Sequence, residues 1–141
     1  MGDVMSWVVC FKPLMSSRLG LPRRSAQFFD QLRQIGYSPR VLGTVAIGLF
    51  GKNRMDAIYP DVHRLPLRRR LAAYVNNLGY WTILEVHLDV TCTLARLDEI
   101  KLVERERLAS QSRYLRLRSC HLIHVPDEIS ELRVVMRMVG S

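Results

Sequence analysis

The chain lacks the features that mark several common classes of protein. Its three cysteines, Cys10, Cys92 and Cys120, are an odd number without the spacing typical of zinc sites. No apolar run approaches the roughly 18 residues needed to cross a bilayer, and the sequence shows no cleavable signal peptide. We therefore expect free thiols in a reducing compartment, and we expect any membrane contact to be made at the surface of the bilayer.

Signatures of catalysis and of cofactor binding are also missing. The glycines at 43, 48 and 51 match neither a Walker nor a dinucleotide-binding pattern. Glu85, His87 and Asp89 would share one face of a strand at about 7 Å spacing, which could serve a metal or proton transfer. We interpret this row as the solvated face of an amphipathic strand. His121 and His124 would lie on opposite faces of another strand, so we predict no catalytic, metal or cofactor site.

Lysine is scarce and arginine is abundant, and the positive charge is unevenly distributed. Residues 1–70 hold twelve Lys or Arg and four Asp or Glu, whereas residues 71–141 hold nine of each, so the net charge of +8 belongs to the first half. A basic half attracts polyanions, which are nucleic acids or anionic membrane surfaces. Arginine suits phosphate contacts, although coding bias would give the same excess over lysine.

Hydrophobic periodicity predicts an α+β fold, with a small antiparallel sheet and helices packed against it in a single compact domain. We assign residues 1–24 to an N-terminal arm and residues 25–141 to the globular domain. The run at 41–50 fits a buried helix or a buried strand, and Pro39 and Gly51 favour a helix. The other expected elements are a helix from Ser25 to Ile35, a loop at 51–66, strands at 82–94 and 113–125, and helices at 98–108 and 127–139.

The N-terminal segment offers a means of membrane attachment. Met1-Gly2-x-x-x-Ser6 fits the N-myristoylation pattern, and one acyl chain needs a second signal for stable anchoring. Palmitoylation of a cysteine, or basic residues against anionic lipid, could supply that signal. The alternative is that residues 4–11 form an ordinary edge strand. The predicted membrane-contact residues are Gly2, Trp7, Val8, Val9, Cys10, Phe11, Lys12, Arg18, Arg23 and Arg24.

Further basic residues form a second candidate surface for polyanions. The triple Arg68-Arg69-Arg70, together with Lys52 and Arg54, could dock phosphates of a nucleic acid, a nucleocapsid or acidic lipid. The row Arg113, Arg116 and Arg118 could do the same, and an ordinary solvated edge is the alternative for both groups.

Several short motifs resemble those of rhabdovirus matrix proteins over residues 28–99. Phe29-Asp30-x-Leu32 is followed by Val45-Ala46-Ile47-Gly48-Leu49 at a spacing similar to the lyssavirus version. Leu67-Arg68-Arg69 resembles a Leu-Arg-Arg that enters a strand, and the strand at 82–94 with Leu97-Asp98-Glu99 is similar to the vesiculovirus pattern. The matching positions are Phe29, Asp30, Ile47, Gly48, Leu49, Arg68 and Arg69.

The resemblance implies a non-enzymatic viral matrix protein at the inner face of the envelope. Such a protein bridges the nucleocapsid and the anionic membrane, self-associates and drives budding, with possible direct contact to RNA. The chain departs from the family in lacking a long polar N-terminal tail and a Pro-Pro-x-Tyr motif.

Two other functions remain open. The first is a small basic RNA-binding protein, such as a viral silencing suppressor or a ribosome-associated factor; the aromatic content of 8% argues against base stacking but not against backbone contacts. The second is a mitochondrial matrix protein, because the first 29 residues carry arginine and serine and only one acid.

Overall fold

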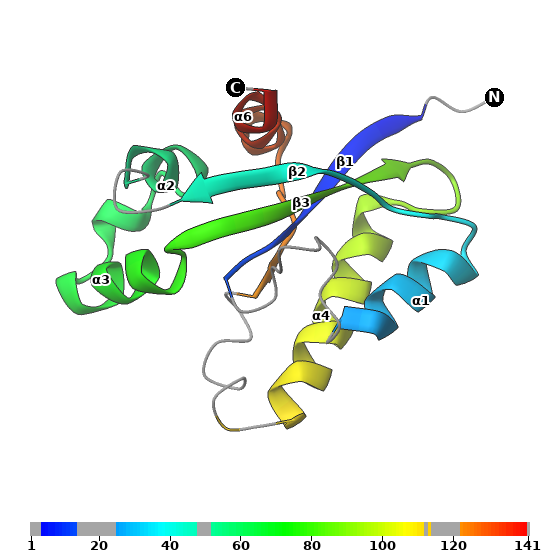
Figure 1. Cartoon of the computed structure of the whole chain (residues 1–141), viewed down its shortest axis with the longest axis horizontal. Helices are drawn as coiled ribbons and strands as arrows, with labels where there is room; N and C mark the ends of the chain where they lie inside the picture. The colour runs from blue at the N-terminus through cyan, green and yellow to red at the C-terminus, as the bar shows by residue number, and fades with distance from the viewer. Residues whose placement is uncertain (1–3, 14–24, 48–51, 112, 114–121, 141) are drawn as a thin grey trace.

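The structure, a computed structural model, describes residues 4–13, 25–47, 52–111, 113 and 122–140, with only the backbone of residues 52–54. Within this part of the chain, four antiparallel strands form one sheet in the order β2-β3-β1-β4 (Figure 1). The strands are β1 (Met5–Phe11), β2 (Arg40–Ile47), β3 (Gly79–Leu88) and β4 (Ile123–His124). The helical elements are α1 (Ala26–Gln34), α2 (Lys52–Ile58), η3 (Val62–Arg64), α3 (Leu67–Asn76), α4 (Leu94–Gln111) and α6 (Ile129–Gly140). The α+β class with a small antiparallel sheet is confirmed.

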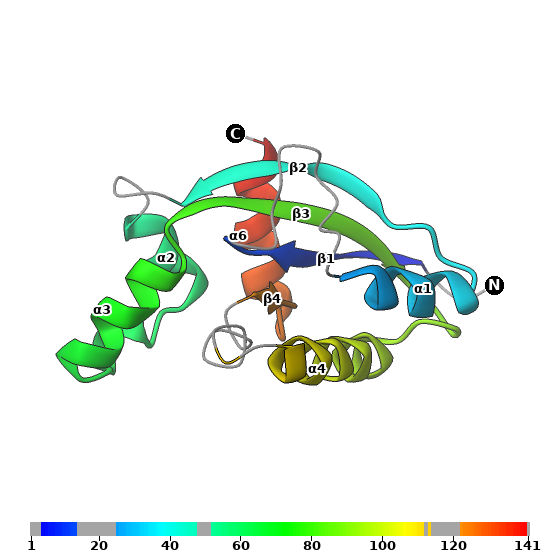
Figure 2. The same cartoon turned by 60° about the horizontal axis from the view of Figure 1, so that its bottom comes forward.

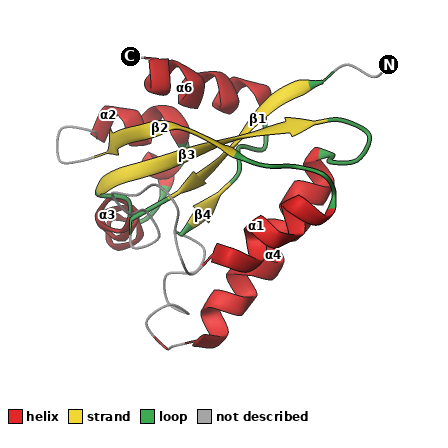
Figure 3. Cartoon of the chain, turned by 45° about the vertical axis from the view of Figure 1, so that its right-hand side comes forward, coloured by secondary structure: helices red, strands yellow, loops and turns green. Residues whose placement is uncertain are grey.

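Helices cover both faces of the sheet. Helix α1 packs against α4 on one face, while α2 packs against α6 on the other, and α6 also contacts β2 (Figures 1 and 3). Successive side chains of a strand point to opposite faces, so a strand in the middle of this arrangement is apolar along its whole length. Strand β1 meets that requirement from Trp7 to Phe11, where every residue is buried.

The position of β1 corrects the division into an arm and a domain. Residues 5–11 pair with β3 along their whole length, from Met5 opposite Leu88 to Phe11 opposite Thr82. Cys10 and Phe11 also pair with β4. This segment therefore belongs to the globular domain that we assigned to residues 25–141, and it is an interior strand rather than the edge strand considered above.

The helix expected at 41–50 is wrong over its described part, because Arg40–Ile47 is strand β2. It pairs with β3 from Arg40 opposite Glu85 to Ile47 opposite Gly79, with a bulge between Val41 and Gly43. A helix here would leave the outer edge of β3 without hydrogen-bond partners, and pairing satisfies it. Val45 and Ile47 are two residues apart, so they lie on the same face of β2, and both are buried.

The strand expected at 82–94 ends earlier, at Leu88. The carboxylate of Asp89 accepts hydrogen bonds from the backbone N–H of Thr91 at 2.7 Å and of Cys92 at 3.1 Å, which folds residues 89–92 into a turn. Helix α4 then begins at Leu94 rather than at Asp98, because the Thr93 hydroxyl accepts from the N–H of Arg96 at 3.2 Å and caps it.

Two of the other expected elements are confirmed, and the remaining ones differ in the structure. The helices at 25–35 and 127–139 are confirmed as α1 and α6. The loop expected at 51–66 instead contains α2 and η3, and Leu67-Arg68-Arg69 enters a helix rather than a strand. Of the strand expected at 113–125, Ile123 and His124 form β4, and residues 114–121 lie outside the described residues.

Candidate functional site

Helix α3 lies at the end of the molecule where β2 ends and β3 begins, away from α1 and α4 (Figure 2). Pro66 precedes its first residue, where proline fixes a backbone angle suited to helix entry. The helix packs mainly against η3, and none of its residues is buried. It is therefore a helix whose outer surface the described part of the chain leaves open.

The outer surface of α3 carries an apolar stripe. Leu67, Leu71 and Val75 are 61%, 53% and 58% exposed. Their spacing of four residues places them next to one another on a helix. Single exposed apolar residues are ordinary, but a contiguous row on one helix marks a surface for a partner or a membrane.

Arginine borders this stripe. Helix α3 contains Arg68, Arg69 and Arg70 and no acidic residue. Arg68 and Arg69 are exposed, while the Nη1 of Arg70 donates to the backbone oxygen of His63 at 3.4 Å. The N–H groups at the start of the helix add further positive potential. Helix α3 is thus both basic and apolar on the side that faces away from the sheet.

The inner side of α3 is held by polar contacts. The hydroxyl of Tyr74 donates to the Oδ1 atom of Asp56 on α2 at 2.8 Å, and this hydrogen bond raises the pKa of Tyr74. At the end of the helix, the Nδ2 group of buried Asn77 donates to the oxygen of Ala73 at 2.8 Å. The bond from Tyr74 to Asp56 joins α3 to α2 and so determines which side of α3 faces outward, whereas the Asn77 bond closes the end of the helix itself.

The predicted membrane-contact residues of the N-terminal segment lie in the core instead. Trp7, Val8, Val9, Cys10 and Phe11 are at most 4% exposed. The indole of Trp7 donates to the oxygen of Pro126 at 3.0 Å. Burial raises the pKa of the Cys10 thiol to about 12, and an enclosed neutral thiol cannot accept an acyl chain. In this fold these residues are enclosed in the core, where they stabilise the sheet.

Lys12 is also internal, at 1% exposure. Its Nζ donates to the hydroxyl of Tyr59 at 2.5 Å and lies 4.9 Å from the ring centres of both Tyr59 and Trp81. Such ring contacts stabilise a buried cation, so Lys12 has a structural role. Of the remaining predicted contacts, Gly2, Arg18, Arg23 and Arg24 lie outside the described residues, and Lys52 and Arg54 lie on α2 without described side chains.

No pattern in the sequence indicated the polar cluster around Lys12. His124 of β4 pairs with Glu131 of α6, and its ring lies 5.1 Å from that of Tyr59. Burial lowers the pKa of His124, and the hydrogen bond to Glu131 opposes this shift. Lys12, Tyr59 and His124 line a cavity of about 500 Å³. Because His124 bonds to Glu131 and Lys12 bonds to Tyr59, we interpret these groups as polar contacts that hold α6 and the end of α2 against the sheet.

The row Glu85, His87 and Asp89 does not act as one group. The Glu85 carboxylate accepts from the Nε of Arg40 at 3.0 Å and the hydroxyl of Ser6 at 3.1 Å, and it bonds to the Nε2 of His87 at 2.7 Å. Asp89 belongs to the turn described above. The side chain of Glu85 is only 11% exposed, so the expectation of a solvated row is wrong at this residue. No cluster suited to a metal ion occurs among the described residues.

This arrangement makes folding stability depend on pH through Glu85. The hydrogen bonds from Arg40 and then from His87 lower the pKa of Glu85 from 4.5 to about 2. The folded state therefore binds fewer protons than the unfolded state, and the stabilisation is complete above pH 4.5 and is lost as the pH falls toward 2. Denaturant titrations across this range should show a shallower fall for Glu85→Gln than for the wild type. Parallel curves for the two proteins would contradict the assignment.

No helix among the described residues is long and apolar enough to cross a membrane. Comparisons with protein-family models, with curated proteins and with solved structures give no match to this chain. The features of this chain that bear on function are therefore the surface of α3 and the sequence motifs.

Proposed function

We propose that this protein is a non-enzymatic adaptor that binds an anionic membrane surface through α3. The observation that carries the proposal is the apolar stripe of Leu67, Leu71 and Val75, exposed on a helix with three arginines and no acid. A basic amphipathic helix lies in the membrane interface with its apolar side among the acyl chains and its cationic groups at the lipid phosphates.

Both components of the surface are needed to explain it. Each arginine near an anionic leaflet contributes about 1 kcal/mol of binding free energy, and burial of a leucine side chain contributes about 1.5–3 kcal/mol. A surface for nucleic acid would use the arginines through phosphate contacts, but it would have no use for the row of Leu67, Leu71 and Val75. The combination favours lipid over RNA.

The narrower proposal is a viral matrix protein at the inner face of the envelope and at the periphery of membranes in the host cytoplasm. Its support is the basic first half of the chain and the motifs that match at residues 28–99, apart from Leu67-Arg68-Arg69, which enters a helix here. In this role the protein would join the viral nucleoprotein or ribonucleoprotein to the membrane and self-associate during assembly and budding. A basic RNA-binding protein is the alternative that the arginines of α3 alone would support.

Vesicle flotation with the full chain tests membrane binding. We expect the wild type to float with phosphatidylserine-containing vesicles, to float poorly with phosphatidylcholine vesicles, and to lose binding as salt increases. Replacing Arg68 and Arg69 by glutamine should weaken binding about 30-fold, from about 1 kcal/mol per arginine. Leu71→Ser should weaken it about tenfold through lost apolar burial.

Matched controls locate the effect on α3. Arg33→Gln with Arg96→Gln removes two arginines with side chains 62% and 48% exposed on α1 and α4. Val90→Ser removes an apolar side chain that is 87% exposed. Both controls should bind vesicles nearly as well as the wild type. If Leu71→Ser binds vesicles normally while the arginine variant loses affinity for single-stranded RNA, the membrane proposal is wrong and RNA binding replaces it.

A further inference from the structure

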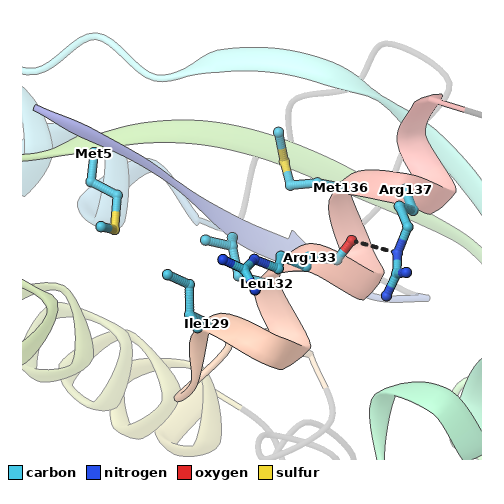
Figure 4. Close-up of a pocket in the computed structure, with 6 residues that line it drawn as sticks. All are labelled: Met5, Ile129, Leu132, Arg133, Met136 and Arg137. Atoms are coloured by element: carbon cyan, nitrogen blue, oxygen red, sulfur yellow. Dashed lines mark hydrogen bonds between the residues drawn. The ribbon is translucent and has the colours of Figure 1, made fainter.

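Helix α6 and the first residue of β1 form an apolar groove of about 480 Å³ (Figure 4). Its apolar walls are Met5, Ile129, Leu132 and Met136, of which Met5, Ile129 and Met136 are 46%, 45% and 38% exposed. Arg133 and Arg137 complete the lining, and the Nε of Arg137 donates to the backbone oxygen of Arg133 at 3.3 Å. Neither arginine has an ion-pair partner among the described residues. The groove is thus apolar with a cationic border.

Helix α4 presents a patch of opposite character on its outer surface. Leu102 and Val103 are 54% and 49% exposed. Glu99 and Glu106, three residues before Leu102 and three after Val103, are also exposed and lie on the same side of the helix by the spacing of helical neighbours. Glu106 has no ion-pair partner in the described part of the chain, and Glu99 pairs with Arg96 at 3.0 Å. This patch is apolar with an anionic border.

We propose that the α4 patch of one copy of the chain docks in the α6 groove of the next. Leu102 and Val103 would enter the groove beside Ile129 and Met136. Glu99 and Glu106 would meet Arg133 and Arg137. Apolar contact supplies the attraction, and the complementary borders fix the orientation and reject like-charged surfaces. The chemistry that recognises the groove is therefore present on the chain itself.

The placement of the two patches requires a second copy. Helices α4 and α6 lie on different sides of the sheet (Figures 1 and 3), so one molecule cannot bring its own patches together. A contact between two different surfaces is heterologous, and its repetition produces a ring or an extended filament rather than a closed dimer. The inference deepens the self-association within the proposed function, and it does not involve α3.

A charge-exchange experiment tests this contact with the full-length protein. One variant carries Arg133→Glu and Arg137→Glu, and the other carries Glu99→Arg and Glu106→Arg. Each variant alone should self-associate at least tenfold more weakly than the wild type, because like charges meet at every contact. An equimolar mixture should regain assembly, since each groove then faces a patch of opposite charge. Sedimentation velocity over a concentration series measures all three samples.

The same samples distinguish loss of this contact from loss of folding. All four positions are exposed, so thermal unfolding should match the wild type and confirm that the variants fold. A wild type that stays monomeric, variants that assemble like the wild type, or a mixture that stays dissociated would each overturn the proposal. The Arg68 and Arg69 variant should assemble normally while losing vesicle binding, so failure of the membrane proposal remains distinct from failure of this one.

Discussion

Phe11→Ala is expected to lower the free energy of unfolding by about 4 kcal/mol, as for other fully buried phenylalanines. Phe11 is 0% exposed. Its ring lies 5.6 Å from that of Phe28 in an edge-to-face contact and 5.7 Å from that of Phe29 in a stacked contact. The three rings join β1 to α1, so the truncation leaves a cavity where the sheet meets a covering helix. A loss of this size is a large share of the about 5–15 kcal/mol that stabilises a typical domain.

Urea denaturation measures this effect, with Val4→Ala as the control. Val4 precedes the same strand but is 60% exposed, so its truncation should change the free energy of unfolding by less than about 0.5 kcal/mol. The comparison also tests the role of the N-terminal segment. If residues 4–11 were a membrane arm, both substitutions would leave the stability of the soluble protein unchanged.

Arg107→Ala is expected to destabilise the fold by about 3 kcal/mol, because it leaves a buried carboxylate without its counter-ion. Glu104 of α4 has a side chain that is 0% exposed. Arg107, one turn further along, pairs with it through two hydrogen bonds, the Nε bond measuring 3.1 Å. Without the arginine, the free-energy cost of burying the charged carboxylate remains, and the ion pair that offset this cost is lost.

The double variant Glu104→Leu with Arg107→Leu separates this mechanism from simple loss of side-chain packing. Replacing both members of a buried ion pair by apolar residues is often neutral or stabilising, so the double variant should be clearly more stable than Arg107→Ala. Arg96→Ala breaks the exposed pair with Glu99 on the same helix and should cost about 0–1 kcal/mol. A double variant as unstable as Arg107→Ala would contradict this account of the pair.

Local periodicity was sufficient to predict α1, α6 and most of β3 from the sequence. Phe28, Phe29 and Leu32 repeat at helical spacing, and all are buried in α1. Periodicity failed at residues 40–47, where most side chains are apolar and fit a helix as well as a strand. The segment is a strand because it pairs with the otherwise open edge of β3. Alternation of polar and apolar residues also predicted a strand that continues past Leu88. The pattern does not reveal that the carboxylate of Asp89 forms the hydrogen bonds of a turn there.

The proposed membrane-binding surface of α3 was predicted from the sequence only in part. Arg68 and Arg69 were identified as basic, but Leu67, Leu71 and Val75 could equally have been core residues. Their exposure follows from the position of α3 at the end of the sheet, which no local pattern encodes. The N-terminal segment is the opposite case, since residues predicted to be exposed are buried. An apolar run beside basic residues fits a membrane contact as well as an interior strand. Pairing with β3, more than 70 residues away, places that segment in the core.

The position of β1 between β3 and β4 also has a consequence for biosynthesis. The hydrogen bond from Trp7 to Pro126 spans 119 residues, so β1 can pair with β3 well before its contacts with β4 and Pro126 can form. At roughly 5–20 residues per second, synthesis of this span takes on the order of ten seconds. During this time the edge of β1 at Cys10 and Phe11, which β4 later covers, lacks its partner strand. This open edge of β1 is accordingly where we expect chaperones that bind extended apolar segments to act while the chain is being made.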